Sequence, residues 1–211
     1  MIVGSILLAF AIDASWDARQ DRALTNQRIA ALIGEFDQAR AEIESEIRGV
    51  RSSHEGSLAV LALFSVPPGE RSIEELSAEM TQSFNVGVFT VQDPVLTMML
   101  TSGELLEAQD DDLLALIAEW QDRIEHLRMD SQNLEYNRNE VILGRAVQIG
   151  IPVGLPSEDF RMLAILDDPG MEAAFLTRAG RSRRLDPAYQ SAFDVANQIT
   201  GRLDQLWPAA R

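Results

Sequence analysis

A regular stripe of apolar residues in the first third of the chain constrains the fold more than any other feature. The stripe advances in alternating steps of four and three residues and has eleven positions: Ile29, Ile33, Phe36, Arg40, Ile43, Ile47, Val50, His54, Ser57, Leu61 and Phe64. Eight of them are apolar, and the exceptions are Arg40, His54 and Ser57. Residues at this spacing share one face of an α-helix, and a heptad repeat favours packing against other helices. The sequence therefore predicts a long helix, which Pro67 and Pro68 should end because proline cannot continue the helical hydrogen bonds.

Two more long helices are predicted downstream. The first runs from about Asp111 to Leu143, and its stripe has nine positions: Leu113, Ile117, Trp120, Ile124, Leu127, Ser131, Leu134, Arg138 and Val141. Seven of them are apolar, and the exceptions are Ser131 and Arg138. The second runs from about Asp186 to Leu206 and carries Ala192, Ala196, Ile199, Leu203 and Leu206 on one face. With no useful strand-like alternation, the pattern predicts an all-α fold, an antiparallel bundle of three long helices plus shorter ones.

The shorter helices are predicted from local start and stop signals. Ser72 followed by Glu75 is a capping-box pattern that opens a helix. Asp93-Pro94 predicts an N-cap with proline at the first helical position. The expected ranges are about 72–84, 93–103, a helix capped by Ser157-Glu158 and running to Leu166, and 171–178 after a turn at 167–170.

Charge and composition exclude several classes of function. The formal net charge is −15, and such a surface repels phosphate backbones, so nucleic acid is not expected as a partner. The chain has no cysteine and no lysine, which excludes thiolate metal sites, a cysteine nucleophile and a lysine-containing phosphate loop. No Gly-x-Ser-x-Gly pattern occurs either. We therefore expect no catalytic residues, no cofactor and no enzymatic activity.

The N-terminal residues resemble the end of a membrane anchor. Residues 1–12 carry no charge, and Trp16, Arg19 and Arg22 follow where a helix would leave the lipid interface. The uncharged run alone is shorter than the ~20 residues that span a bilayer. It is either the start of a buried helix or part of a transmembrane helix whose first turns lie upstream of Met1, and we favour the second. This predicts an anchor over residues 1–18 and a helical-bundle domain over 19–211.

Two blocks of sequence resemble an uncharacterised family of single-pass bacterial membrane proteins. The first block is the exit segment Ala11 to Arg22, and the second is Met99 to Leu105 followed by Asp112-Leu113 and Trp120. The resemblance implies an inner-membrane protein with its N-terminus in the cytoplasm and its bundle in the periplasm. It implies no catalytic residues. Family members carry a basic segment before a full-length hydrophobic helix, and this chain lacks that segment.

The two histidines offer little metal chemistry. A di-iron bundle needs Glu-x-x-His pairs, but Arg51 and Arg123 stand three residues before His54 and His126. His126 with Asp122 and Glu119 is expected to form a solvated helix face rather than a weak metal site. His54 falls on the apolar stripe, where it either fixes helix register or acts as a pH-dependent switch in the core, and we favour the first. The run of Asp110, Asp111 and Asp112 predicts a helix N-terminus, where carboxylates are stabilised by the helix dipole.

One basic cluster remains, formed by Arg178, Arg181, Arg183 and Arg184. The sequence places it in a loop. The cluster either balances neighbouring carboxylates or contacts an anionic partner such as a lipid headgroup.

These observations favour a membrane-anchored helical interaction or scaffold module that presents a surface to a protein partner or to itself. The alternative is an extracytoplasmic sensor, a helical bundle with a small-molecule pocket. A hydrolase or metal enzyme is the least favoured class.

Overall fold

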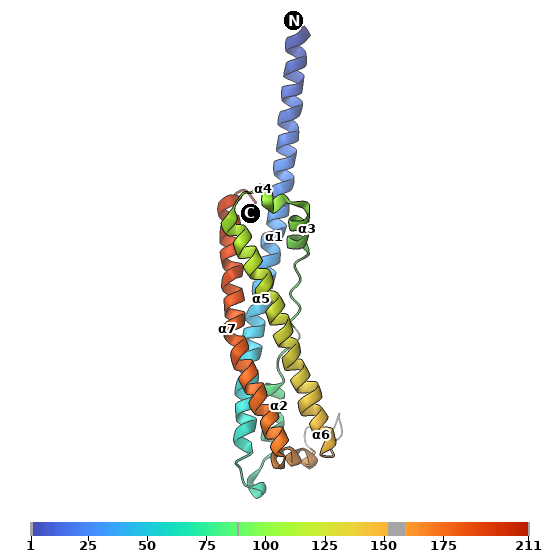
Figure 1. Ribbon diagram of the computed structural model, residues 1–211, viewed down its shortest axis with the longest axis vertical. Helices are drawn as coiled ribbons and strands as arrows, with labels where there is room; N and C mark the ends of the chain where they lie inside the picture. Colours follow the sequence, from blue (N-terminus) through green and yellow to red (C-terminus); the bar gives the residue numbers. More distant parts are fainter. Residues whose placement is uncertain (1, 88, 152–158, 211) are drawn as a thin grey trace. The chain divides into compact units, whose positions relative to one another are not determined.

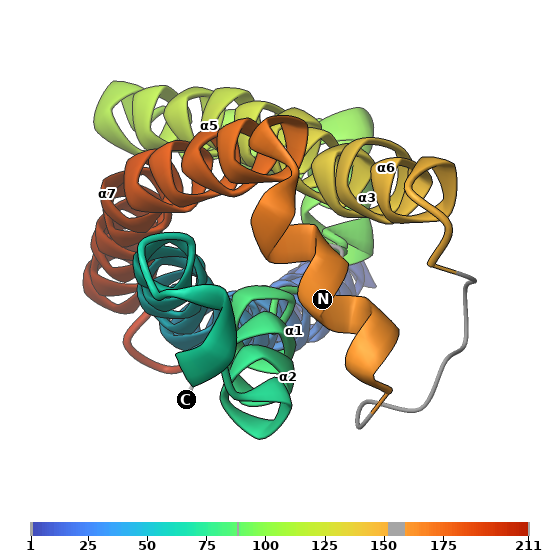
Figure 2. The same cartoon turned by 90° about the horizontal axis from the view of Figure 1, so that it is seen from below.

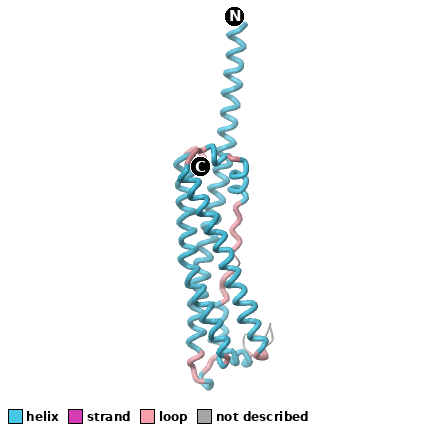
Figure 3. Tube along the Cα trace, viewed as in Figure 1, coloured by secondary structure: helices cyan, strands magenta, loops and turns pink. Residues whose placement is uncertain are grey.

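The computed structural model describes residues 2–87, 89–151 and 159–210 of the chain. In these residues all regular secondary structure is helical, with no β-strand (Figures 1 and 3). The α-helices are α1 (Ile2–Leu63), α2 (Ile73–Ser83), α3 (Pro94–Ser102), α4 (Glu104–Glu107), α5 (Asp111–Tyr136), α6 (Gly144–Gln148) and α7 (Pro169–Leu206). The predicted all-α fold class is thereby confirmed for the described residues.

Most local start and stop signals act as predicted. Helix α1 ends at Leu63, just before the two prolines. The Ser72 hydroxyl accepts a hydrogen bond from the Glu75 main-chain N–H at 3.2 Å and caps α2. Asp110 caps α5 by accepting from the Leu113 N–H at 2.8 Å. These contacts are made within three or four residues, which explains why sequence alone could predict them.

Three predictions for residues 157–170, a cap, a helix and a turn, have different outcomes. The expected cap at Ser157-Glu158 lies outside the described residues. The helix that follows is a 3-10 helix, Phe160–Asp167, and Asp159 caps it by accepting from the Arg161 N–H at 2.9 Å. The turn predicted at 167–170 is wrong, because Asp168 instead caps α7 by accepting from the Met171 N–H at 2.9 Å.

The chain divides into two compact units, which we describe separately. Unit 1 comprises residues 1–40, 92–118 and 195–211, and unit 2 comprises residues 41–91 and 119–194. Unit 1 buries apolar side chains from five helices: Ile29, Leu32, Ile33 and Phe36 of α1, Leu96 and Met99 of α3, Leu105 of α4, Leu113 and Ile117 of α5, and Ile199 and Leu203 of α7. An ion pair between Arg28 and Glu104 joins α1 to α4 within this unit.

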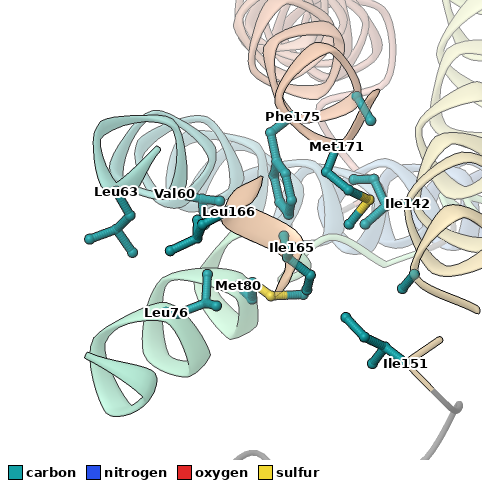
Figure 4. Close-up of a cluster of buried hydrophobic side chains, with 12 residues drawn as sticks. Val60, Leu63, Leu76, Met80, Ile142, Ile151, Ile165, Leu166, Met171 and Phe175 are labelled. Carbon is teal, nitrogen blue, oxygen red and sulfur yellow. The ribbon is translucent and has the colours of Figure 1, made fainter. Parts of the chain in front are cut away.

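Unit 2 surrounds its own apolar core. Its parts of α1, α5 and α7, together with α2 and α6, enclose a common interior (Figure 2). One end of this interior holds Val60, Leu63, Leu76, Met80, Ile142, Ala146, Ile151, Ile165, Leu166, Met171, Ala174 and Phe175 (Figure 4). These side chains come from segments far apart in the sequence, so the core forms only when those segments dock.

A π-helical segment, Asn137–Leu143, follows α5 and changes the buried face. The sequence stripe predicts Val141 on the apolar face, but Val141 is 38% exposed, whereas Asn137 and Ile142 are buried. A π-helix bonds each carbonyl to the N–H five residues later rather than four, so each hydrogen-bonded ring encloses one more residue and the buried face shifts. The regular heptad count therefore fails beyond Leu134.

Asp93 is the N-cap residue of α3 and Pro94 its first helical residue, as predicted, but the side chain that caps the helix comes from a residue distant in sequence. Asp93 makes no side-chain hydrogen bond to the start of the helix. The Glu35 carboxylate, from α1, instead accepts from the Val95 N–H at 2.8 Å and from the Leu96 N–H at 3.0 Å. All of these residues belong to unit 1. Glu35 thus satisfies two N–H groups that α3 cannot pair internally.

We expect Glu35→Ala to lower the free energy of unfolding by about 1–2 kcal/mol, because a lost N-cap costs this much. Hydrogen exchange at the Val95 and Leu96 amides should accelerate at the same time. The matched control is Asp93→Ala, which should change the unfolding free energy by less than about 0.5 kcal/mol. An equal loss in both variants, measured by urea unfolding, would contradict the assignment of the cap to Glu35.

Candidate functional site

The basic cluster lies on a helix, so its prediction as a loop is wrong. Helix α7 is continuous from Pro169 to Leu206 and includes Pro187. Its buried positions continue at helical spacing through the cluster: Ala174, Phe175, Arg178, Ala179, Ser182, Leu185, Tyr189 and Ala192. Burial of this face favours one uninterrupted helix over the break that Gly180 and Asp186-Pro187 indicate locally.

Arg178 differs from the other arginines of the cluster because its side chain is buried. Its exposed fraction is only 1%. The guanidinium donates from Nε to the Ser83 carbonyl at 2.8 Å and from Nη1 to the Leu134 carbonyl at 2.9 Å. It also lies 5.2 Å from the centre of the Phe84 ring, within the range of a cation–π contact. Arg178 therefore cannot reach an external anionic partner, which corrects that part of the prediction.

The charge of Arg178 is held by main-chain carbonyls and an aromatic ring. Among the residues that the structure describes, it forms no ion pair with a carboxylate. Burial, and secondarily the nearby positive charge of Arg138, lower the pKa of Arg178 to about 10. The core of unit 2 thus contains a cation whose compensation comes from dipoles on α2 and α5.

Small residues on α1 let the end of α2 approach closely beside Arg178. The Ser53 hydroxyl donates to the Ser83 carbonyl at 2.5 Å, and the Ser57 hydroxyl lies 2.8 Å from that of Ser83. A Cβ atom added at Gly56 would lie 2.5 Å from the Ser83 main-chain nitrogen. The Ser83 carbonyl accepts from both Ser53 and Arg178, which uses both of its lone pairs. This network joins α1, α2 and α7 in unit 2.

His54 lies at the edge of the same region. It is half-buried, and its Nδ1–H donates to the Ala179 carbonyl at 3.0 Å. This contact joins α1 to α7 in unit 2 and agrees with a role in fixing helix register. A pH-dependent switch at His54 stays a prediction.

The other three arginines are accessible and divide into two groups. Arg181 donates to the Asn133 carbonyl at 2.7 Å, whereas Arg183 and Arg184 are exposed and form no hydrogen bond or ion pair within the described part of the chain. Arg181 and Arg184 line a pocket of about 260 Å³ between α5 and α7, together with Asp130, Asn133 and Leu185. Asp130 and Asn133 carry no signal of this pocket in the sequence, because only the packing of α5 against α7 brings them to the arginines.

The residues around His126 behave as a solvated helix face. His126 donates to the Asp122 carbonyl at 2.8 Å, and this bond, together with the Asp122 charge, raises the pKa of the imidazole. Glu119 is occupied by an ion pair with Arg123. No group of three or more His, Asp or Glu residues in the described part of the chain is arranged to hold a metal ion.

The predicted interfacial residues lie on a part of α1 that its own chain leaves uncovered. Trp16 is 67% exposed, and each of residues 19–24, including Arg19 and Arg22, is exposed. Six consecutive exposed residues leave no face of a helix covered. Within unit 1, this part of α1 extends beyond α3 and α4 (Figure 1). Over the described residues, no helix has the length and apolar character that a membrane crossing requires.

Comparison with protein-family models, curated proteins and solved structures found no match to this chain. The resemblance to a family of single-pass membrane proteins therefore stays a prediction, and the function has to be argued from the residues themselves.

Proposed function

We propose that this chain is a membrane-anchored helical interaction module whose long helices α1, α5 and α7 form a bundle. The sequence predicts an antiparallel arrangement of all three, but within unit 2 only α7 runs antiparallel, because α1 and α5 run in the same direction (Figure 1). The N-terminal run of α1 associates with lipid, and the bundle presents its helices to a protein partner or to a second copy. The proposed location is the bacterial inner membrane, with the bundle on the periplasmic side. The module has no catalytic activity. The observation that carries the proposal is the uncovered stretch of α1, residues 19–24, which is separated by six residues from the uncharged run 1–12.

The anchor is supported by the chemistry of this stretch. Residues 2–12 are uncharged and helical, and they rise about 16 Å along the helix axis at ~1.5 Å per residue. This is about half the ~30 Å thickness of the hydrocarbon layer. Trp16 follows at the position where an amphipathic ring favours the interface, and Arg19 and Arg22 lie beyond it. A run of apolar residues of this length is favourable only where lipid or protein covers it.

Exposed apolar residues on α3 and α4 offer a second contact. Met98 on α3 is 46% exposed and Leu106 on α4 is 56% exposed. The Arg28–Glu104 ion pair places α4 level with the part of α1 just below the uncovered stretch. Both helices therefore lie at the end of unit 1 from which α1 extends (Figure 1), where a membrane surface would meet them.

Vesicle flotation tests the anchor. The full chain should float with vesicles of phosphatidylethanolamine and phosphatidylglycerol, and Leu7→Glu/Leu8→Glu should reduce the bound fraction at least tenfold, because two charges in the lipid core cost about 2.5 kcal/mol or more each. The control is Leu24→Glu, which adds a charge beyond the interface and should float as the unmodified chain does. A full chain that stays in the aqueous fraction would sink the proposal, as would equal flotation of the double variant.

A second candidate function is supported by the pocket between α5 and α7. A helical sensor needs a small-molecule site, and this pocket in unit 2 holds charged side chains from both helices. The chemistry of a ligand for this pocket can be argued independently of the membrane anchor.

A further inference from the structure

The pocket between α5 and α7 of unit 2 contains charges of both signs. Asp130 and Asn133 come from α5, and Arg181, Arg184 and Leu185 come from α7. Leu185 is buried, so the lining combines an apolar contact with charged groups open to solvent. A smaller pocket of about 180 Å³ shares Asp130 and continues along the same two helices past Asp122, Arg123, His126, Leu127 and Ala188. We call the first of these two, the pocket of about 260 Å³, the α5–α7 pocket.

The charged groups in this pocket are not neutralised by one another. Arg181 is held by a neutral main-chain carbonyl, and Arg184 makes no hydrogen bond or ion pair in the part of the chain that the structure describes. Asp130 forms no ion pair with either arginine, although all three line the same pocket. Several arginines elsewhere in the described chain are, by contrast, paired with carboxylates, as in Arg145–Asp168 at 2.8 Å and Arg202–Asp110 at 2.7 Å.

This pattern of charge selects among ligands. A simple anion would be attracted by two guanidinium groups but repelled by the Asp130 carboxylate. A simple cation would be attracted by the Asp130 carboxylate but repelled by the two guanidinium groups. A molecule with both charges satisfies every group, since a guanidinium binds a carboxylate through paired hydrogen bonds and a carboxylate accepts from an ammonium group. A volume of about 260 Å³ admits a small molecule, not a polymer.

We propose that the α5–α7 pocket binds a small zwitterion of the amino-acid type, with its carboxylate at Arg181 and Arg184 and its ammonium group at Asp130. Leu185 contacts the apolar part of the ligand. Arg181 is positioned in advance by its hydrogen bond to the Asn133 carbonyl, which reduces the entropy lost on binding. The proposal does not depend on the membrane anchor, so either can fail alone.

Isothermal titration of the full chain with each of the twenty standard L-amino acids tests this. At least one should bind with a dissociation constant below 1 mM. Its N-acetyl derivative, which lacks the ammonium group, and its carboxamide, which lacks the carboxylate, should each bind at least tenfold more weakly. Arg184→Met and Asp130→Asn should each weaken the zwitterion at least tenfold. The control Arg183→Met removes an exposed arginine that does not line the pocket and should leave the affinity unchanged.

The derivatives also separate the proposal from simple anion binding. In Asp130→Asn the N-acetyl derivative should bind as well as the zwitterion does, because the ammonium group no longer has a partner. All variants are exposed at the substituted side chain, and circular dichroism should confirm unchanged helix content. Three results would overturn the proposal: no amino acid binding with a dissociation constant below 1 mM, inorganic phosphate binding more tightly than any zwitterion, or Arg183→Met weakening binding as much as Arg184→Met.

Discussion

Gly56→Ala is expected to lower the free energy of unfolding by about 3 kcal/mol, because overpacking of a tight contact costs this much. The added Cβ would lie 2.5 Å from the Ser83 nitrogen and 2.8 Å from the Glu79 carbonyl oxygen. Both are main-chain atoms of the end of α2, so no side-chain rotation can relieve the clash. Helix α2 must move away from α1, and the hydrogen bonds of Ser53 and Ser57 to Ser83 are lost with it.

Gly34→Ala is the matched control on the same helix. Gly34 is exposed, and a Cβ there would have no neighbour within 4 Å. Alanine should therefore stabilise the protein by about 0.5–1 kcal/mol through its higher helix propensity. Urea unfolding of the two variants gives opposite signs if the close approach of α2 is real. A stabilised Gly56→Ala variant would refute the contact.

Arg178→Ala is expected to cost about 3–4 kcal/mol, since truncating a buried side chain leaves a cavity. Arg178→Met should cost less than about 1 kcal/mol, because methionine fills similar space and the buried charge is removed. The Ser83 carbonyl keeps the hydrogen bond from Ser53 in both variants. The lowered pKa of Arg178 has the same cause, since burial disfavours the charged form.

Urea unfolding of both variants, beside Arg183→Ala as an exposed control, separates packing from hydrogen bonding. Arg183→Ala should change the unfolding free energy by less than about 0.5 kcal/mol. A loss with methionine as large as that with alanine would mean that the bonds to the Ser83 and Leu134 carbonyls, rather than the volume of the side chain, hold unit 2 together.

The sequence by itself determined the all-helical class and several of the helix ends. The all-α class and the end of α1 before Pro67 follow from periodicity and from backbone chemistry, as do the caps at Ser72 and Asp110. Each depends on contacts between residues no more than about four positions apart, so the local sequence is enough to predict them.

Only the tertiary structure decided which polar residues are enclosed and which remain available. Arg178 stands in a basic cluster in the sequence, yet its guanidinium is buried because Ser83 and Leu134 lie beside it in the fold. Glu35 caps a helix that begins about sixty residues later, as its bonds to Val95 and Leu96 show. The α5–α7 pocket likewise joins side chains separated by about fifty residues. Such pairs depend on how the helices dock. The periodicity of one helix predicts which of its faces is buried, but not which residues of another helix that face contacts.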